Sequence, residues 1–393
     1  MSYNTHLTGI LHVSEAEYNA SPDDYKKTDC LYIIENSTDF KLLLGTKPIK
    51  GSEAAFNTIN DFTLFKNMTS VQVPDSVTSL GNYAFSSPQY SSGDHSAMVN
   101  LTLIDMPDTI TSIGNYAFYG CSALPEIDLP SSLTSLGTYA LASCKALTSV
   151  SIPSGVTALS NYLFAYCTGL KRISAPSAVS VGNYCFTGCT GLTEFTLPYN
   201  VTTIGNYAFQ NCSNMTEISV PDDVTSIGDY AFTGCAKLCY RQPTLENPDT
   251  YIPLTLPSSL TNLGSYAFQN CTSIGVVTIP NGVTALKSNT FAGCTALERV
   301  IASGLTSIAG SAFLNCAKLK VFTIPETVTS IGSNAFKGCS SLYEMTIPAS
   351  VTTIGSNAFS GCTNLTSITI NKASGSISGA PWGAPNAVVN WTG

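Results

Sequence analysis

The stretch LTEFTLPYNVTTIGNYAFQNC, residues 192–212, is one copy of a unit that recurs through most of this 393-residue chain. One aromatic column marks the copies, with successive members 22 or 23 residues apart except for one step of 33 and one of 36. A single unit of this length cannot bury its own apolar side chains, whereas stacked units bury a continuous core. The sequence therefore predicts a solenoid. The column contains Phe85, Phe118, Leu141, Phe164, Phe186, Phe209, Phe232, Phe268, Phe291, Phe313, Phe336 and Phe359.

Each unit divides into two predicted elements. Residues 192–198 alternate in polarity and end at a proline, which predicts a short strand whose copies stack into a parallel sheet. The residue three positions before each member of the column is of a type favoured as a helix N-cap, such as Asn206 before Phe209. Ala, Phe and Cys then recur at one-turn spacing. The predicted fold is an α/β repeat solenoid of about 12–13 turns of about 23 residues, with a parallel sheet on one face and short helical turns on the other.

Composition excludes several classes of function. The chain is 44% hydrophobic and 11% charged, and 17 Lys and Arg against 25 Asp and Glu give a net charge of −8. Nucleic acid and anionic membranes both favour a basic surface, so we expect neither as a partner. No stretch approaches the ~18–20 apolar residues of a membrane span, so we expect no membrane insertion. The sequence has no nucleophile elbow, Walker loop or metal triad, which predicts a non-enzymatic protein with no catalytic residue, metal or cofactor.

The chain has 14 cysteines, and eleven of them stand three residues after the aromatic column. Metal binding would need clustered Cys-x-x-Cys pairs or histidine partners, which are absent. A ladder of disulfides is the other functional possibility, but a small buried thiol in a fixed core position is the simpler one. We predict buried, reduced thiols. The eleven are Cys121, Cys144, Cys167, Cys189, Cys212, Cys235, Cys271, Cys294, Cys316, Cys339 and Cys362.

The unit, with consensus LxxIxIPxxVTxIGxYAFxxC, resembles the BspA-like leucine-rich repeats, for example at 192–212, 215–235 and 342–362. The resemblance covers about residues 62–370. It implies a right-handed leucine-rich-repeat solenoid and a surface binding protein of bacteria or some protists, usually an adhesin. We therefore assign residues 61–370 to the solenoid. Residues 371–393 resemble the closing segment of such arrays, and we expect Trp382 and Trp391 to cap the last turn.

Residues 1–60 differ from the repeat and predict a small α+β or β-hairpin module for attachment or oligomerisation. Residues 14–24 predict a helical start, and two strand-like runs within 30–49 flank a polar turn at 35–39. This pattern resembles short modules of phage and prophage tail, fibre and other virion proteins. The first residues have no basic segment followed by an apolar run, so we expect no secretory signal peptide. That expectation favours a virion protein, which leaves the cell by lysis.

A tyrosine column is the first candidate ligand site. It stands two residues before the aromatic column and is replaced by Asn289, Ser311, Asn334 and Asn357 in the last turns. Helical spacing predicts that it is largely exposed, with copies about 5 Å apart. The rings could form an aromatic ladder for a glycan or protein, or only shield the edge of each turn. The candidates are Tyr83, Tyr116, Tyr139, Tyr162, Tyr184, Tyr207, Tyr230 and Tyr266.

Two insertions, 86–100 and 239–253, are the second candidate site, because loops on a rigid scaffold often carry function. Their candidate ligand residues are Tyr90, Tyr240, Arg241 and Tyr251. The first insertion also contains His95, for which the sequence offers no identifiable catalytic partner. Tolerated surface insertion is the alternative. A third candidate surface is a row of exposed strand residues that carry both positive and negative charges. The simpler explanation of these residues is that they only keep the strand surface solvated. This row contains Glu126, Ser149, Arg172, Glu194, Glu217, Arg299 and Glu344.

Together these patterns predict a non-enzymatic binding protein. Our first hypothesis is a phage or prophage virion protein, of tail, fibre or head-fibre type, assembled in the bacterial cytoplasm. Residues 1–60 would bind a virion partner and form a homo-oligomer, a trimer as in many fibres. The repeats would bind a host-cell surface protein or glycan. The alternative is a BspA-like adhesin on the bacterial cell surface.

Overall fold

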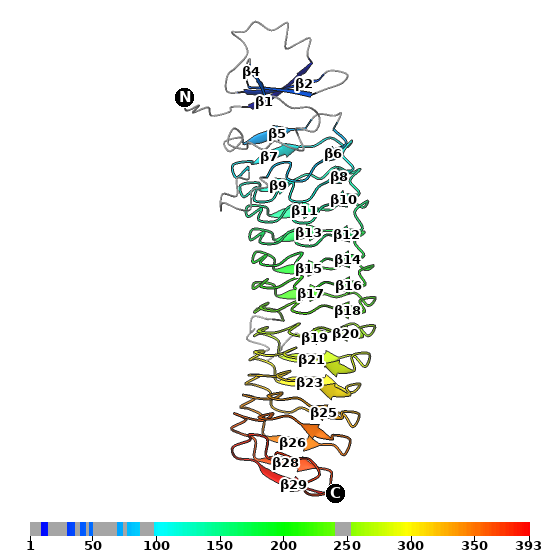
Figure 1. Ribbon diagram of the computed structural model, residues 1–393, viewed down its shortest axis with the longest axis vertical. Helices are drawn as coiled ribbons and strands as arrows, with labels where there is room; N and C mark the ends of the chain where they lie inside the picture. Colours follow the sequence, from blue (N-terminus) through cyan, green and yellow to red (C-terminus); the bar gives the residue numbers. More distant parts are fainter. Residues whose placement is uncertain are drawn as a thin grey trace, which may run out of the picture. The chain divides into compact units, whose positions relative to one another are not determined.

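The computed structural model describes residues 9–14, 30–35, 40–44, 47–49, 69–73, 77–86, 98–239 and 253–393. The chain forms two compact units, Met1–Ala178 and Val179–Gly393. Each unit is a parallel-sheet β-solenoid, and together the units contain about 12 turns (Figure 1). The aromatic column places four of these turns in the first unit and eight in the second. The predicted repeat solenoid is therefore confirmed.

Each turn contributes strands to two ladders. We call the strands that stack in the position of residues 194–196 ladder A, and the shorter strands in the following VTxIG-like segment ladder B. Sequence reasoning predicted ladder A but missed ladder B. In the first unit, ladder A contains β5 (Ser70–Gln72), β7 (Leu103–Asp105), β9 (Glu126–Ile127), β11 (Ser149–Ser151) and β13 (Arg172–Ser174). Ladder B there contains β6 (Ser79–Leu80), β8 (Ser112–Ile113), β10 (Ser135–Leu136) and β12 (Ala158–Leu159).

The second unit repeats the arrangement. Its ladder A contains β15 (Glu194–Thr196), β17 (Glu217–Ser219), β19 (Leu254–Thr255), β21 (Val276–Ile279), β23 (Arg299–Ala302), β26 (Glu344–Ile347), β28 (Ser367–Ile370) and β29 (Val388–Trp391). Its ladder B contains β14 (Ser180–Val181), β16 (Thr203–Ile204), β18 (Ser226–Ile227), β20 (Asn262–Leu263), β22 (Ala285–Leu286), β24 (Ser307–Ile308), β25 (Ser330–Ile331) and β27 (Thr353–Ile354). All the pairings in these ladders are parallel, for example Phe195 with Ile218.

Before the first turns, the first unit has a separate four-stranded sheet of order β1-β2-β3-β4. Its strands are β1 (Gly9–Ser14), β2 (Cys30–Glu35), β3 (Phe40–Leu44) and β4 (Lys47–Ile49). Strands β2 and β3 pair antiparallel, which confirms the predicted hairpin. The predicted helical start at 14–24 lies outside the described residues, apart from Ser14 at the end of β1.

The described residues contain no helix, so the predicted short helical turns are wrong. The backbone between the two strands forms successive turns that bond to the next copy. Tyr207 N–H donates to Asp229 O at 2.8 Å, and Phe209 N–H donates to Ala231 O at 2.7 Å. A residue in helical conformation would bond within its own segment instead. The backbone of Tyr207 also has φ of 58°, which no right-handed helix accommodates.

The predicted N-cap residues have a different role. The Asn206 side chain accepts the backbone N–H of Asp229 at 2.8 Å, and the Asp229 carboxylate accepts that of Ser265 at 2.7 Å. The same bond joins Asn82 to Asn115 in the first unit. Asn and Asp are therefore favoured here because they satisfy a donor of the following turn.

The core is a column of stacked aromatic rings flanked by thiols. Phe209 is fully buried, with its ring centroid 5.1 Å from Phe186 and 5.2 Å from Phe232. Beside it, the Cys235 Sγ donates to the Phe209 carbonyl at 3.1 Å. Desolvation by burial raises the pKa of Cys235 to about 12. All 13 cysteines whose side chains the structure describes are buried thiols rather than disulfides, which confirms the prediction of reduced core thiols.

The last turn is closed by the segment assigned as a C-terminal cap. Trp382 is buried, its Nε1 donates to Ser378 O at 2.8 Å, and its ring meets Phe359 edge-on at 6.4 Å. Strand β29 pairs with β28 and places Trp391 opposite Ile370. Trp382 thus continues the aromatic column beyond its last phenylalanine.

Neighbouring turns approach closely at a glycine column, which supplies a stability test. A Cβ on Gly228 would lie 2.6 Å from Asn206 N and 2.7 Å from Gly205 C, both backbone atoms of the previous turn. We expect Gly228→Ala to lower the free energy of unfolding by about 1–3 kcal/mol, since the two backbones must separate. Urea unfolding followed by circular dichroism measures this. The control is Gly310→Ala, whose Cβ would meet nothing nearer than 3.2 Å. Equal effects would contradict the close approach.

Candidate functional site

The tyrosine column forms a stacked row in each unit. In the first unit the row contains Tyr83, Tyr116, Tyr139 and Tyr162, with successive ring centroids 4.9, 4.6 and 4.2 Å apart. In the second unit it contains Tyr184, Tyr207, Tyr230 and Tyr266, at 4.4, 4.6 and 4.3 Å. Interplanar angles are 10° or less in both rows. The predicted spacing of about 5 Å is therefore confirmed.

Each of these tyrosines has a left-handed backbone conformation, with φ between 56° and 60°. Asn289, Asn334 and Asn357 take the same conformation in the later turns. Asparagine adopts it at lower cost than a bulky residue, so the backbone alone does not explain the tyrosines. Stacked aromatic pairs contribute about 0.5–1.5 kcal/mol beyond their buried area, which offsets that cost. Sequence reasoning missed this conformation.

The tyrosines are half-buried, which corrects the prediction that they are largely exposed. That prediction assumed a helical turn. In the structure each inner ring has both faces covered by its neighbours in the row. The face is thus unavailable for stacking on a sugar, and the ring edge and hydroxyl are what a ligand would contact.

Neighbouring tyrosine hydroxyls are close enough to hydrogen bond, as between Tyr139 and Tyr162 and between Tyr230 and Tyr266. Desolvation, followed by the neighbouring hydroxyl, raises the pKa of Tyr139. The pKa of Tyr230 is raised for the same reasons, together with the nearby charge of Asp229. The hydroxyls of Tyr139 and Tyr230 therefore stay protonated at neutral pH and can both donate and accept hydrogen bonds.

Sequence reasoning missed one aromatic side chain at this site. Tyr119 packs edge-on against Tyr116 at 5.7 Å and against Tyr139 at 6.2 Å. It stands one residue after Phe118, and no other turn has an aromatic residue at that position. That irregularity is the signal in the sequence that could have revealed it.

The insertion candidates Tyr90, His95, Tyr240, Arg241 and Tyr251 lie outside the described residues. The insertions leave the tyrosine rows intact, because Tyr83 stacks on Tyr116 and Tyr230 on Tyr266 across them.

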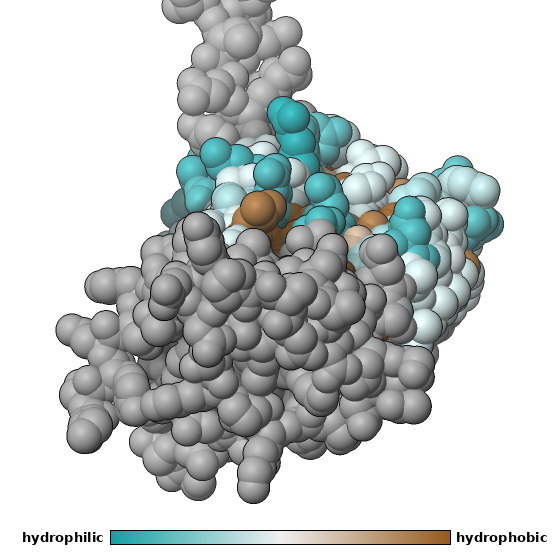
Figure 2. Space-filling view, turned by 90° about the horizontal axis from the view of Figure 1, so that it is seen from above, coloured by the Kyte–Doolittle hydropathy of each residue, from teal (hydrophilic) through white to brown (hydrophobic). Residues whose placement is uncertain are grey.

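The exposed strand row is in register within each unit. Glu126, Ser149 and Arg172 lie opposite one another on β9, β11 and β13, and Glu194 lies opposite Glu217. Elsewhere on the exposed surface, Lys320 and Glu298 form an ion pair at 3.0 Å. Where described residues are visible in Figure 2, their surface is mostly hydrophilic or neutral, with a few hydrophobic residues between. Because the row carries both acidic and basic side chains, it does not indicate one class of ligand.

The described residues contain no group of three or more His, Cys, Asp and Glu side chains that could hold a metal ion. In the part of the chain that the structure describes, no helix has the length and hydropathy needed to cross a membrane.

The family model described as BspA type Leucine rich repeat region matches residues 57–94, 91–181, 177–247 and 242–366. No curated protein matches the chain. A crystal structure of a leucine-rich repeat protein from Bacteroides ovatus is similar, with 28% identity, a TM-score of 0.67, and coverage of 84% of this chain and 85% of that one. A leucine rich cell surface protein from Faecalibacterium prausnitzii is 25% identical, with a TM-score of 0.41, and the match covers 70% of this chain and 86% of that one.

Proposed function

The chain belongs to the BspA type leucine rich repeat family, and from this premise we propose that it is a non-catalytic binding or adhesion protein that holds its ligand along the tyrosine rows. The observation that carries the proposal is the stacking of four half-buried tyrosines in each unit on closely joined turns. Repeat proteins commonly bind ligands along such extended surfaces.

The chemistry of the rows defines the kind of ligand. Because the inner ring faces are covered, binding would rest on hydroxyl groups and ring edges spaced at the repeat distance. An extended glycan or a protein surface rich in hydrogen-bonding groups suits this arrangement. With only 11% charged residues, the chain has little electrostatic steering, so we propose a host-cell surface protein or glycan as the ligand. We place the protein on the bacterial cell surface, as the family resemblance implies.

The test of the tyrosine rows is a triple substitution, Tyr139→Asn, Tyr162→Asn and Tyr184→Asn. Asparagine fits because Asn289 occupies the same column with φ of 57°. The wild-type chain is first screened against immobilised polysaccharides and extracellular proteins to find those that it binds. We expect the triple variant to bind these at least about tenfold more weakly, while its circular dichroism spectrum stays that of the folded chain. The matched control is Asn289→Ser, Asn334→Ser and Asn357→Ser, which alters the column where tyrosine is absent. Unchanged binding in the tyrosine variant would assign the rows a purely structural role.

A virion protein is the second proposal, and it rests on the resemblance of residues 1–60, which contain the separate sheet β1–β4 ahead of the repeats, to virion modules. The family model begins at residue 57, so residues 1–56 have no family assignment. Genes for capsid or tail proteins beside the coding sequence would support this proposal. We propose that residues 1–60 also form the oligomer, and mass photometry of the full chain should then show a trimer. A monomer would contradict it.

A further inference from the structure

Ladder A of the second unit is interrupted between β17 and β19, and again between β23 and β26. The break between β17 and β19 is the one beside a cavity. Strand β15 pairs with β17, and β19 pairs with β21, but β17 and β19 belong to different sheets. Ladder B continues through the same two turns, since Ser226 and Ile227 on β18 pair with Asn262 and Leu263 on β20. The two turns are thus joined on one side and separated on the other.

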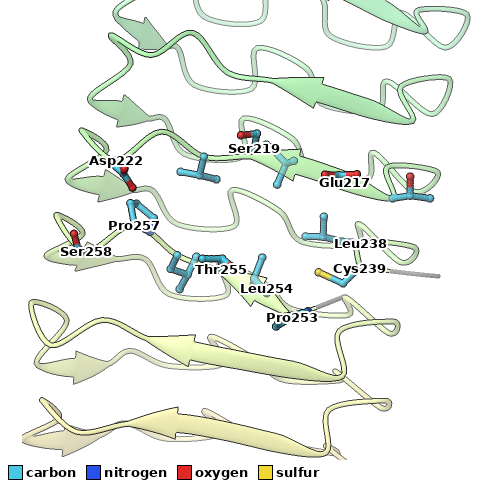
Figure 3. A pocket seen from close by; sticks show the side chains of 14 residues that line it. Glu217, Ser219, Asp222, Leu238, Cys239, Pro253, Leu254, Thr255, Pro257 and Ser258 are labelled. Atoms are coloured by element: carbon cyan, nitrogen blue, oxygen red, sulfur yellow. The ribbon is translucent and has the colours of Figure 1, made fainter. Parts of the chain in front are cut away.

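The opening has defined ends. At one end Cys239 N–H donates to Thr216 O at 2.9 Å, and at the other Ser259 Oγ donates to Val224 O at 2.7 Å. Between these bonds lies a cavity of about 480 Å³. We call it the β17–β19 slit. Figure 3 shows Glu217, Ser219 and Asp222 on one wall, with Leu254, Thr255 and Ser258 on the other.

Burial of the core residues confirms that the slit is open. Ile218 and Val220 on the β17 wall are only half-buried. Their counterparts one turn earlier, Phe195 and Leu197, are 4% and 3% exposed. The same sequence pattern therefore leaves the apolar side chains of β17 partly uncovered at this break. An occupant would cover them.

The walls determine the chemistry of the occupant. Both are parallel strand edges whose facing backbone groups are not joined in a ladder, and unpaired strand edges add a further strand readily. Among the described residues that line the slit, the charged ones are Glu217 and Asp222, both exposed and acidic. Glu194, in register with Glu217, adds a third carboxylate on the neighbouring strand.

We infer that the β17–β19 slit binds an extended basic segment of a partner protein as an added parallel strand. The backbone of that segment would bond to β17 on one edge and to β19 on the other. Its side chains alternate between the two faces. Apolar ones would cover Ile218 and Val220, and lysine or arginine side chains would face Glu217 and Asp222. This site is separate from the tyrosine rows and does not depend on them.

A labelled peptide tests the inference. The probe is a fluorescein-labelled peptide of four Lys-Val repeats, added to the full chain and followed by fluorescence anisotropy. We expect saturable binding, and at least tenfold weaker binding by Glu217→Lys/Asp222→Lys. The matched control is Glu344→Lys/Glu326→Lys, which reverses exposed charges at the equivalent positions of other turns. Its binding should equal that of the wild type. Equal losses in the two variants would show non-specific charge attraction and overturn the site.

Two further measurements distinguish strand addition from other contacts. The same peptide with N-methylated valines cannot donate backbone bonds on those residues, so its binding should fall at least tenfold. Hydrogen exchange with the unmodified peptide should protect amides of 217–220 and 254–256. Unchanged binding of the methylated peptide, or protection elsewhere, would overturn the inference. Binding that appears only after 240–252 is replaced by a short Gly-Ser linker would also overturn it, because the chain itself would then occupy the slit.

Discussion

Raising the pH from about 8 to about 10 is expected to unfold the second unit cooperatively. Burial raises the pKa of its core thiols above the ordinary value of 9.0, so the folded chain keeps protons that the unfolded chain releases. Stability is therefore complete below the unfolded pKa of 9.0 and falls as the pH rises above it. Six of these thiols are almost wholly buried: Cys212, Cys235, Cys271, Cys294, Cys316 and Cys339.

The expected loss is large. One pH unit above its unfolded pKa, each protonated buried thiol destabilises the fold by ~1.4 kcal/mol. Six such thiols together remove about 8 kcal/mol near pH 10, comparable with the whole stability of many domains. Tyr207 and Tyr230 shift in the same direction from an ordinary pKa of 10.0, and add to the effect only at higher pH.

Urea unfolding under reducing conditions, repeated at intervals between about pH 8 and about pH 10, measures the slope of the unfolding free energy. We expect a slope approaching six protons for the second unit. The triple variant Cys212→Ala, Cys271→Ala and Cys316→Ala should lose close to half of that slope, although it starts from lower stability because each substitution leaves a cavity. A slope below about one proton would contradict the thiol column.

The sequence predicted the features that follow from burial. The phenylalanine and cysteine columns repeat because each turn needs the same core volume, and Phe209 and Cys212 lie where the periodicity placed them. Strand β15 was predicted from its alternation and its proline. The free thiols followed from the absence of paired cysteine motifs.

The helical turns were mispredicted because two structures share one spacing. Asn206, Phe209 and Cys212 recur every three residues, as on one face of a helix. Successive turns give the same spacing, since Cys212 N–H bonds to Phe209 O and Gln210 N–H to Tyr207 O. Backbone hydrogen bonds to the next turn distinguish a helix from successive turns, and those bonds join residues that are far apart in the sequence. The exposure of the tyrosines was mispredicted for the same reason, and the β17–β19 slit depends on pairing that no local pattern encodes.

The second large effect is expected in the aromatic column. Phe209→Ala should lower the free energy of unfolding by about 3–5 kcal/mol. Phe209 is fully buried between Phe186 and Phe232, and Phe195 lies 5.9 Å away. Collapse into the cavity is restricted, because the Phe209 backbone bonds to Ala231 O and accepts the Cys235 thiol. The lost volume thus stays empty, and urea unfolding at neutral pH should show the full cost.

The control for this prediction is present in the chain, because Leu141 fills the same column and is fully buried. Phe209→Leu should therefore cost less than half as much as Phe209→Ala. Each turn is stabilised by contacts with the turns on both sides, and the alanine variant weakens these contacts at one turn. We therefore expect two unfolding transitions for the second unit, one for the turns before Phe209 and one for the turns after it. Equal losses for the leucine and alanine variants would contradict tight packing in the column. A single transition in the alanine variant would show that coupling between turns outweighs the cavity.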